Sequence, residues 1–325
     1  MSKVGMKLKN GIFKTTLNMK EKLKNSRFIL KLYTDYLYFR NKFLCKLNPK
    51  FAANVEYKKF FGRYINWENP KDLIEKIYWM ELNTDTSLWT LCADKYKVRE
   101  FIKERGCEDT LVKLYGAWKN PYDIDFDKLP NSFVLKANNG CGTVMIVKDK
   151  NTLDFDKTKK TLKEWIKRPY GYSSAQLHYL GIETYIIAEE LISNSKDKDK
   201  ALNDYKIWCF DGKPESILVV HDRTKNGYKL SFFDLKWNNI SEQTLNKNNP
   251  HYWGGDVERP ASLDEMLAVA AKLSKGFPEV RADFYDIDGK AYFGELTFST
   301  GYGSYSQEYY RHLGDKVDLN LANKK

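Results

Sequence analysis

The chain has 325 residues, of which 42% are hydrophobic and 15% aromatic, and this composition excludes a disordered protein. The net charge of +11 arises within residues 1–50, which contain 11 Lys and 2 Arg but only 1 Asp and 1 Glu. The rest of the chain is neutral overall. The five cysteines show no C-x-x-C spacing, so neither a disulfide framework nor a zinc site is expected, and a reducing cytoplasm is the predicted location.

Residues 1–50 are predicted to form a basic helical arm. Apolar residues recur at spacings of three and four between Phe28 and Leu47, and the other face is rich in Lys. One interpretation is a helical pair that packs on the body with a solvated basic face. The other is a peripheral anchor on the inner face of an anionic membrane. Nucleic acid is not expected as a partner, because no binding motif accompanies the charge.

The rest of the chain changes in character along its length. Residues 51–130 have a mostly helical pattern, and residues 131–192 contain short strands joined by turns. Residues 193–325 begin with a polar surface loop and continue with hairpins. Within them, Ser262–Glu265 has the sequence of a capping box that opens an amphipathic helix.

A glycine-containing loop, Asn138-Asn139-Gly140-Cys141-Gly142, follows a strand that bears Lys136. Such a loop can fold over a polyphosphate, with backbone N–H groups facing the oxygens and Lys136 and Lys95 supplying positive charge. A plain hairpin turn is the competing interpretation, because the loop lacks the Walker A spacing and no helix follows it.

Two carboxylates, Glu189 and Glu190, end the strongly apolar strand predicted over residues 185–192. They fit either the rim of a pocket or an ordinary strand exit.

The segment VRADFYDIDGKAYFGELTF, residues 280–298, carries the strongest signal. Arg281 and Asp283 share one face of a strand, and Glu295 and Thr297 share one face of its partner. A two-residue turn would leave Glu295 on the face opposite Asp283, so we predict an odd-length connection that brings all four to one face. Two carboxylates beside an Arg suit Mg²⁺ with phosphate oxygens, and the competing interpretation is a cross-strand salt bridge.

Six segments that occur in order from about residue 55 to 305 together resemble the TupA-like family of the ATP-grasp superfamily. They are NPKDLIEKIYWMEL, ADKYKVREFIKERG, KLPNSFVLKANNGCG, HYLGIETYIIAEELI, DYKIWCFDGKP and RADFYDIDGKAYFGELTFSTGYGSY. The resemblance implies an α+β ATP-grasp fold of two lobes with ATP in the cleft between them, preceded here by the basic arm. Residues 131–192 would form the small lobe and residues 193–325 the large lobe.

The resemblance also implies roles for individual residues. Lys95 and Lys136 would contact phosphates, and Gly140, Cys141 and Gly142 would form a flap. Glu189, Glu190 and Leu191 would offer the hinge backbone to adenine, and Asp204 would bind ribose. Lys206 and Arg281 would act on the phosphates or the reacting acyl group. Asp283 and Glu295 would bind Mg²⁺, with Thr297 where many relatives carry Asn and Cys141 where we expect Ser.

The activity implied by the resemblance is a Mg-ATP-dependent carboxylate–amine ligase that acts through an acyl phosphate in bacterial cell-surface polysaccharide or teichuronopeptide-type synthesis. The acceptor would be an amino acid or a uronic-acid sugar. The alternative is a metal-dependent glycosyltransferase of surface polysaccharide synthesis. The D-x-D triplets Asp123-Ile-Asp125 and Asp197-Lys-Asp199 lie in polar loops, which argues against it, and a scaffold that has lost activity is a third interpretation.

Overall fold

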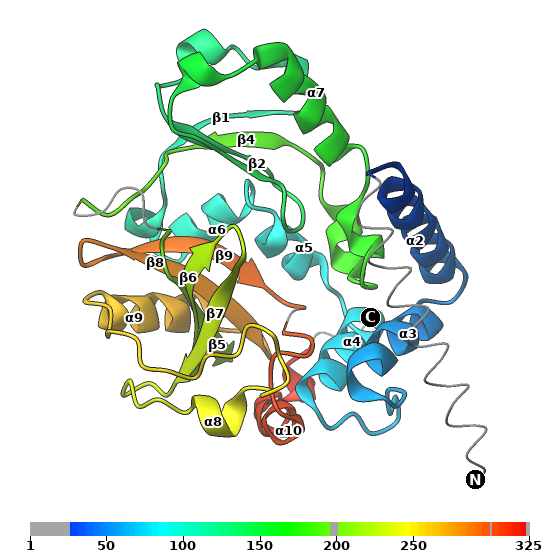
Figure 1. Cartoon of the computed structure of the whole chain (residues 1–325). Helices are drawn as coiled ribbons and strands as arrows, with labels where there is room; N and C mark the ends of the chain where they lie inside the picture. Colours follow the sequence, from blue (N-terminus) through cyan, green and yellow to red (C-terminus); the bar gives the residue numbers. More distant parts are fainter. Residues whose placement is uncertain (1–26, 196–200, 300, 323–325) are drawn as a thin grey trace, which may run out of the picture.

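Two antiparallel sheets, one above the other in Figure 1, organise the chain. The computed structural model describes residues 27–195, 201–299 and 301–322. The first sheet has the strand order β1-β4-β2-β3 and the second the order β7-β6-β5-β8-β9. The predicted α+β class is confirmed. The predicted division of the chain into an arm, a helical region and two lobes stays a prediction.

The strands of the first sheet are β1 (Leu114–Trp118), β2 (Phe133–Ala137), β3 (Val144–Val147) and β4 (Ile186–Glu189). The strands of the second are β5 (Asp204–Phe210), β6 (Lys213–Thr224), β7 (Gly227–Phe233), β8 (Val280–Ile287) and β9 (Lys290–Thr297). The helices are α2 (Arg27–Leu47), α3 (Pro49–Phe61), α4 (Leu73–Asn83), α5 (Ser87–Ala93), α6 (Val98–Glu104), α7 (Phe155–Ile166), α8 (Ser241–Thr244), α9 (Leu263–Ser274) and α10 (Gln307–Lys316).

Each sheet has its own buried apolar core. Helix α7 covers the first sheet (Figure 1) and contributes Leu162 to a cluster that includes Phe133 and Ile186. Helix α9 covers the second sheet and belongs to the larger cluster. Strand β1 lies within residues 51–130, where the sequence pattern predicts mostly helix, and it pairs antiparallel with β4.

The β8–β9 hairpin turns in two residues, so the predicted odd-length connection is wrong. Ile287 pairs with Lys290, and Asp288 and Gly289 form the turn with φ of 52° and 85°. The register shifts by one residue at Gly294, which has no partner residue on β8. This β-bulge puts Glu295 opposite Asp283 after all. A Cβ at position 294 would lie 3.1 Å from the backbone oxygen of Asp283, so the bulge suits glycine.

The helix predicted after residue 262 is confirmed as α9, but the predicted capping box is wrong. The Ser262 hydroxyl donates to Asp286 at 2.6 Å and makes no cap hydrogen bond. The carboxylate of Glu265 accepts from the backbone N–H of Ala291 at 2.9 Å. Both side chains therefore attach α9 to the β8–β9 hairpin.

Asn138 is a fully buried junction between the first sheet and the segment that precedes α6. Its Nδ2 donates to Asp94 Oδ1 at 2.8 Å and to the carbonyl of Glu183 at 2.9 Å. Its Oδ1 accepts from the backbone N–H of Tyr185 at 2.7 Å. The carbonyl of Asn138 accepts from the N–H of Lys95 at 3.0 Å. The side chain and backbone of this one residue thus fix where Lys95 stands relative to β2 and β4.

Asn138→Leu should lower the free energy of unfolding by about 2–4 kcal/mol, because it leaves buried partners without hydrogen bonds. Urea denaturation measures the change, and Asn151→Leu at an exposed position is the control. A loss equal to that of the control would contradict the role of Asn138 as a junction.

Candidate functional site

Asp283 is almost fully buried on β8 and is held by two cations. Arg281 donates two hydrogen bonds to Asp283, from Nε to Oδ1 and from Nη2 to Oδ2, both at 2.7 Å. Lys206 on β5, the strand next to β8, places Nζ 2.5 Å from Oδ2. The fork of Arg281 and the point charge of Lys206 together compensate this buried carboxylate.

Glu295 lies beside Asp283 on the neighbouring strand, as predicted. Its Oε1 is 3.7 Å from Arg281 Nη2, and its Oε2 is 3.3 Å from Lys95 Nζ. Thr297 Oγ1 donates to Oε1 at 3.2 Å. Burial alone would raise the pKa of Glu295, but the charges of Lys95, Lys206 and Arg281 outweigh it and lower the pKa to about 2. All four hairpin residues therefore converge on one face, which confirms that prediction.

Lys95 connects this carboxylate pair to the glycine-containing loop. Its Nζ donates to the carbonyl of Gly140 at 2.7 Å. Gly140 and Gly142 have φ of 84° and 80°, which is a region that favours glycine. A Cβ at Gly140 would also collide with the ring of Tyr170. The loop therefore lies between Lys95 and Tyr170, with Cys141 exposed at its tip.

Lys136 faces Glu189, and the two neighbouring glutamates separate. Lys136 Nζ lies 2.8 Å from Glu189 Oε2, and Arg99 Nη1 lies 3.3 Å from Oε1. Glu190 is exposed, and its backbone N–H donates to the carbonyl of Lys113 at 2.9 Å. Leu191 is half-buried beyond the end of β4. Of the two carboxylates, only Glu189 joins the cationic cluster.

Another carboxylate with cationic partners, Asp204, lies at the start of β5. Asp204 is bound by Nη2 of Arg223, and Lys206 Nζ lies 4.0 Å from its Oδ2. Arg223 also lies over the ring of Tyr228 at 5.3 Å. Lys206 thus stands between Asp204 and Asp283, which places the predicted ribose and metal residues side by side.

The comparisons with known proteins settle the family. A model of the TupA-like ATP-grasp family matches residues 75–318. The chain belongs to the TupA-like ATP-grasp family. No curated protein matches the sequence.

Solved structures similar to this TupA-like ATP-grasp chain include several ligases. One is D-alanine–D-alanine ligase from Bacillus anthracis complexed with ATP, at 19% identity over 72% of this chain and 67% of that chain, with a TM-score of 0.45. Another is the ATP-grasp ligase PsnB complexed with a minimal precursor, at 10% identity over 74% and 64% of the two chains, with a TM-score of 0.40. D-alanine–D-alanine ligase from Helicobacter pylori matches at 14% identity over 74% and 60%, also with a TM-score of 0.40.

The residues of this family member fit a Mg²⁺ ion that is coordinated by both protein carboxylates and phosphate oxygens. Asp283 and Glu295 supply two carboxylates on one face, and Mg²⁺ commonly takes one or two carboxylates plus substrate phosphates. Within the described ranges no group of three or more His, Cys, Asp or Glu could hold a metal by itself. Two carboxylates leave further positions on Mg²⁺ for phosphate oxygens and water.

Positive charge exceeds negative charge in this cluster. Six cations face four carboxylates: Lys95, Arg99, Lys136, Lys206, Arg223 and Arg281 against Glu189, Asp204, Asp283 and Glu295. This excess is suited to a polyphosphate. An open groove of about 600 Å³ shares Arg99 with this cluster, and its other lining residues, such as Tyr96 and Lys113, lie outside the cluster.

Three residues of the site have no individual role predicted from the sequence. They are Arg99, which pairs with Glu189, Asn138, which bonds Asp94, and Tyr170, which lies against Gly140. A useful signal was present for Asn138, because a buried strand followed by an Asn pair favours side-chain bonding to the backbone. Nothing local in the sequence indicates the partners of Arg99 and Tyr170.

Glu279 extends the polar face of β8 inward from Arg281. It is fully buried, and neither carboxyl oxygen has a hydrogen-bond partner among the described residues. Burial raises its pKa well above the usual 4.5, with Glu81 adding to the shift and Arg281 opposing it. The buried carboxyl therefore takes up a proton more readily than an exposed glutamate does.

Glu279→Gln should stabilise the protein increasingly as the pH rises. Below pH 4.5 the Glu279 carboxyl is protonated in both states, so its burial carries no ionisation penalty. Above that pH the unfolded carboxyl ionises, and folding loses about 1.4 kcal/mol per pH unit until the folded pKa is reached. Urea denaturation across this range, with exposed Glu308→Gln as the control, measures the effect. A difference from wild type that does not change with pH would contradict it.

Proposed function

We propose that this family member is a Mg-ATP-dependent ligase that joins a carboxylate to an amine. The observation that carries the proposal is the paired carboxylates Asp283 and Glu295, surrounded by Lys95, Lys206 and Arg281. Two adjacent carboxylates with several cations suit a metal-bound polyphosphate better than a structural salt bridge, because a salt bridge needs only one partner for each charge.

The proposed reaction has two steps. A carboxylate oxygen of the acceptor forms a bond to the γ-phosphorus of ATP, and the bond from that phosphorus to the β–γ bridging oxygen breaks to release ADP. An amine nitrogen then forms a bond to the acyl carbon, phosphate leaves with its C–O bond electrons, and the nitrogen loses a proton. The product is an amide.

The side chains would bind and orient rather than react covalently. Lys95 and Lys136 would hold phosphate oxygens, and Arg281 would use its fork to hold the acyl phosphate. Lys206 would neutralise charge on the transferring group. Mg²⁺ held by Asp283 and Glu295 would supply electrostatic stabilisation of the phosphoryl oxygens when bound. Thr297 would orient Glu295 through its 3.2 Å hydrogen bond.

The remaining predicted roles stay part of this proposal. Gly140, Cys141 and Gly142 would close over the phosphates, and the backbone of Glu189, Glu190 and Leu191 would face adenine. Asp204 would bind ribose after exchanging its partner Arg223.

The acceptor and the setting are also proposals. An amino acid or a uronic-acid sugar would supply the carboxylate, in cytoplasmic synthesis of a bacterial surface polysaccharide or teichuronopeptide-type polymer. Contact of the arm with a membrane is a separate proposal that depends on α2 and not on this site.

The glycosyltransferase alternative gains no support. Asp123 and Asp125 are both exposed outside the cationic cluster. Asp197 and Asp199 lie outside the described residues.

Lys136→Ala should weaken ATP binding more than tenfold, which corresponds to about 1.5–3 kcal/mol for a charge-assisted contact. Calorimetric titration with Mg-ATP measures it, with exposed Lys160→Ala as the control. Unchanged affinity in a folded Lys136→Ala protein would remove Lys136 from the site.

Asp283→Asn and Glu295→Gln should each abolish turnover while the protein stays folded. Each change removes a charged ligand and keeps the side-chain shape. The assay is ADP release in a panel of amino acids and uronic-acid sugars, followed by detection of an amide product. Exposed Glu308→Gln serves as the control. ADP release that never depends on an added carboxylate would contradict the ligase proposal, and equal activity of the variants would contradict the metal site.

A further inference from the structure

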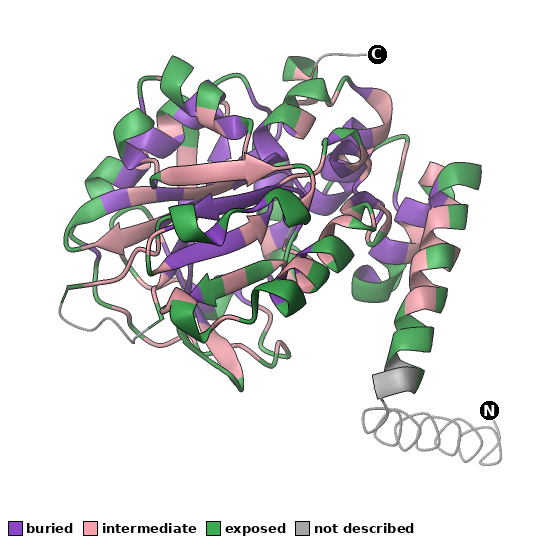
Figure 2. Ribbon diagram, turned by 90° about the horizontal axis from the view of Figure 1, so that it is seen from above, coloured by how far each residue is buried: buried purple, intermediate pink, exposed green. Residues whose placement is uncertain are grey.

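Helix α2 carries an apolar stripe on its outward face. Figure 2 shows this helix at the edge of the molecule, with many of its residues exposed. The side chains recur every three or four positions, so they lie along one side of the helix. The stripe consists of Ile29, Leu32, Tyr33, Tyr36, Phe39, Phe43 and Leu47, which are 41–70% exposed. Monomeric proteins seldom leave so many large apolar side chains together in water.

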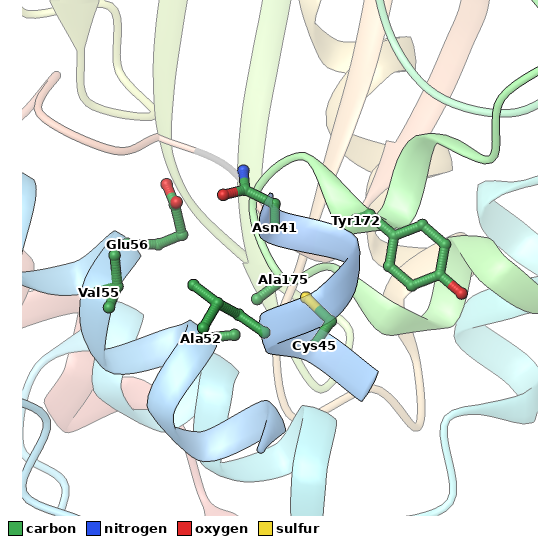
Figure 3. Close-up of a pocket in the computed structure, with 8 residues that line it drawn as sticks. Asn41, Cys45, Ala52, Val55, Glu56, Tyr172 and Ala175 are labelled. Carbon is green, nitrogen blue, oxygen red and sulfur yellow. The ribbon is translucent and has the colours of Figure 1, made fainter. Parts of the chain in front are cut away.

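The opposite face of α2 is fixed on the body. Asn41 Nδ2 donates to the carbonyl of Ser173 at 2.9 Å, and Asp35 pairs with Arg168 at 2.7 Å. Figure 3 shows Asn41 and Cys45 of α2 near Tyr172 and the α3 side chains. The space among them is about 10 Å³, no larger than one water molecule. The helix therefore cannot turn its stripe inward without breaking these contacts.

Positive charge accompanies the stripe. Lys31 and Lys46 of α2 are exposed, as is Lys50 at the start of α3. Residues 1–26, which lie outside the described part, contain 7 Lys and a single acidic residue. No helix in the described ranges is long and apolar enough to cross a membrane. An apolar stripe next to basic residues is the pattern of a helix that lies flat in a lipid interface.

We propose that α2 docks this protein on an anionic phospholipid surface through the stripe. The apolar side chains would enter the interface, while the lysines contact the headgroups. Charge complementarity favours anionic lipid over a second copy of the chain as the partner of the stripe. A second copy of the chain would bring two strongly basic arms together, which costs electrostatic free energy, whereas anionic lipid compensates the charge. The proposal is independent of the ligase activity.

The test is co-sedimentation of the full chain with phosphatidylcholine vesicles, with and without phosphatidylglycerol. Wild type should bind the anionic vesicles, and added salt should weaken binding. The double variant Tyr36→Ser/Phe43→Ser should lower the partition coefficient at least tenfold, because two large apolar side chains no longer enter the interface. Lys31→Glu/Lys46→Glu should weaken binding to anionic vesicles only.

The matched control is Tyr122→Ser/Leu321→Ser, which removes apolar side chains of similar exposure elsewhere on the surface. Equal partitioning of the stripe variant and this control would overturn the proposal. A concentration-dependent dimer that the stripe variant abolishes, seen by light scattering without vesicle binding, would assign the stripe to a second copy. A stripe variant with a lower melting temperature and unchanged vesicle binding would assign it to residues 1–26.

Discussion

The site depends on the charge of two carboxylates that adjacent strands hold side by side. Asp283 and Glu295 are neighbours in register, so each needs positive charge close by. That charge comes from β5 through Lys206, from β8 through Arg281 and from the segment before α6 through Lys95. Lys95 also bonds the carbonyl of Gly140. Charge compensation on the second sheet therefore sets the position of a loop that belongs to the first sheet.

Two further carboxylates near this pair are also compensated by cations. Glu189 at the end of β4 is compensated by Lys136 and Arg99, and Asp204 at the start of β5 is compensated by Arg223. These ion pairs hold the cations in place without a ligand. A polyphosphate could then exchange for the carboxylates as partners at little cost in ordering the side chains, which is the advantage of a preorganised site.

The arm and the glycine-containing loop share one support. Residues 168–173 hold α2 through Arg168 and Ser173. In the same segment, the ring of Tyr170 closes the space next to Gly140. The surface proposed for lipid and the loop proposed for phosphate are therefore both in contact with residues 168–173. Figure 1 places α2 beside this part of the chain, between the first sheet and α3.

The sequence by itself determined the elements with a clear local signal. These include β2, β3, α9 and the two strands that carry Arg281 and Glu295, because periodicity and turn residues act over short distances along the chain. Only the tertiary structure decided which residues pair in the sheets, in the ion pairs and in the side-chain hydrogen bonds. Three features depend on atoms that are distant in sequence. They are the bulge at Gly294, the pairing of Glu189 but not Glu190 with Lys136, and the hydrogen bond from Ser262 to Asp286. Strand register and hydrogen-bond choice minimise the free energy of the whole packed molecule, so no local pattern could fix them.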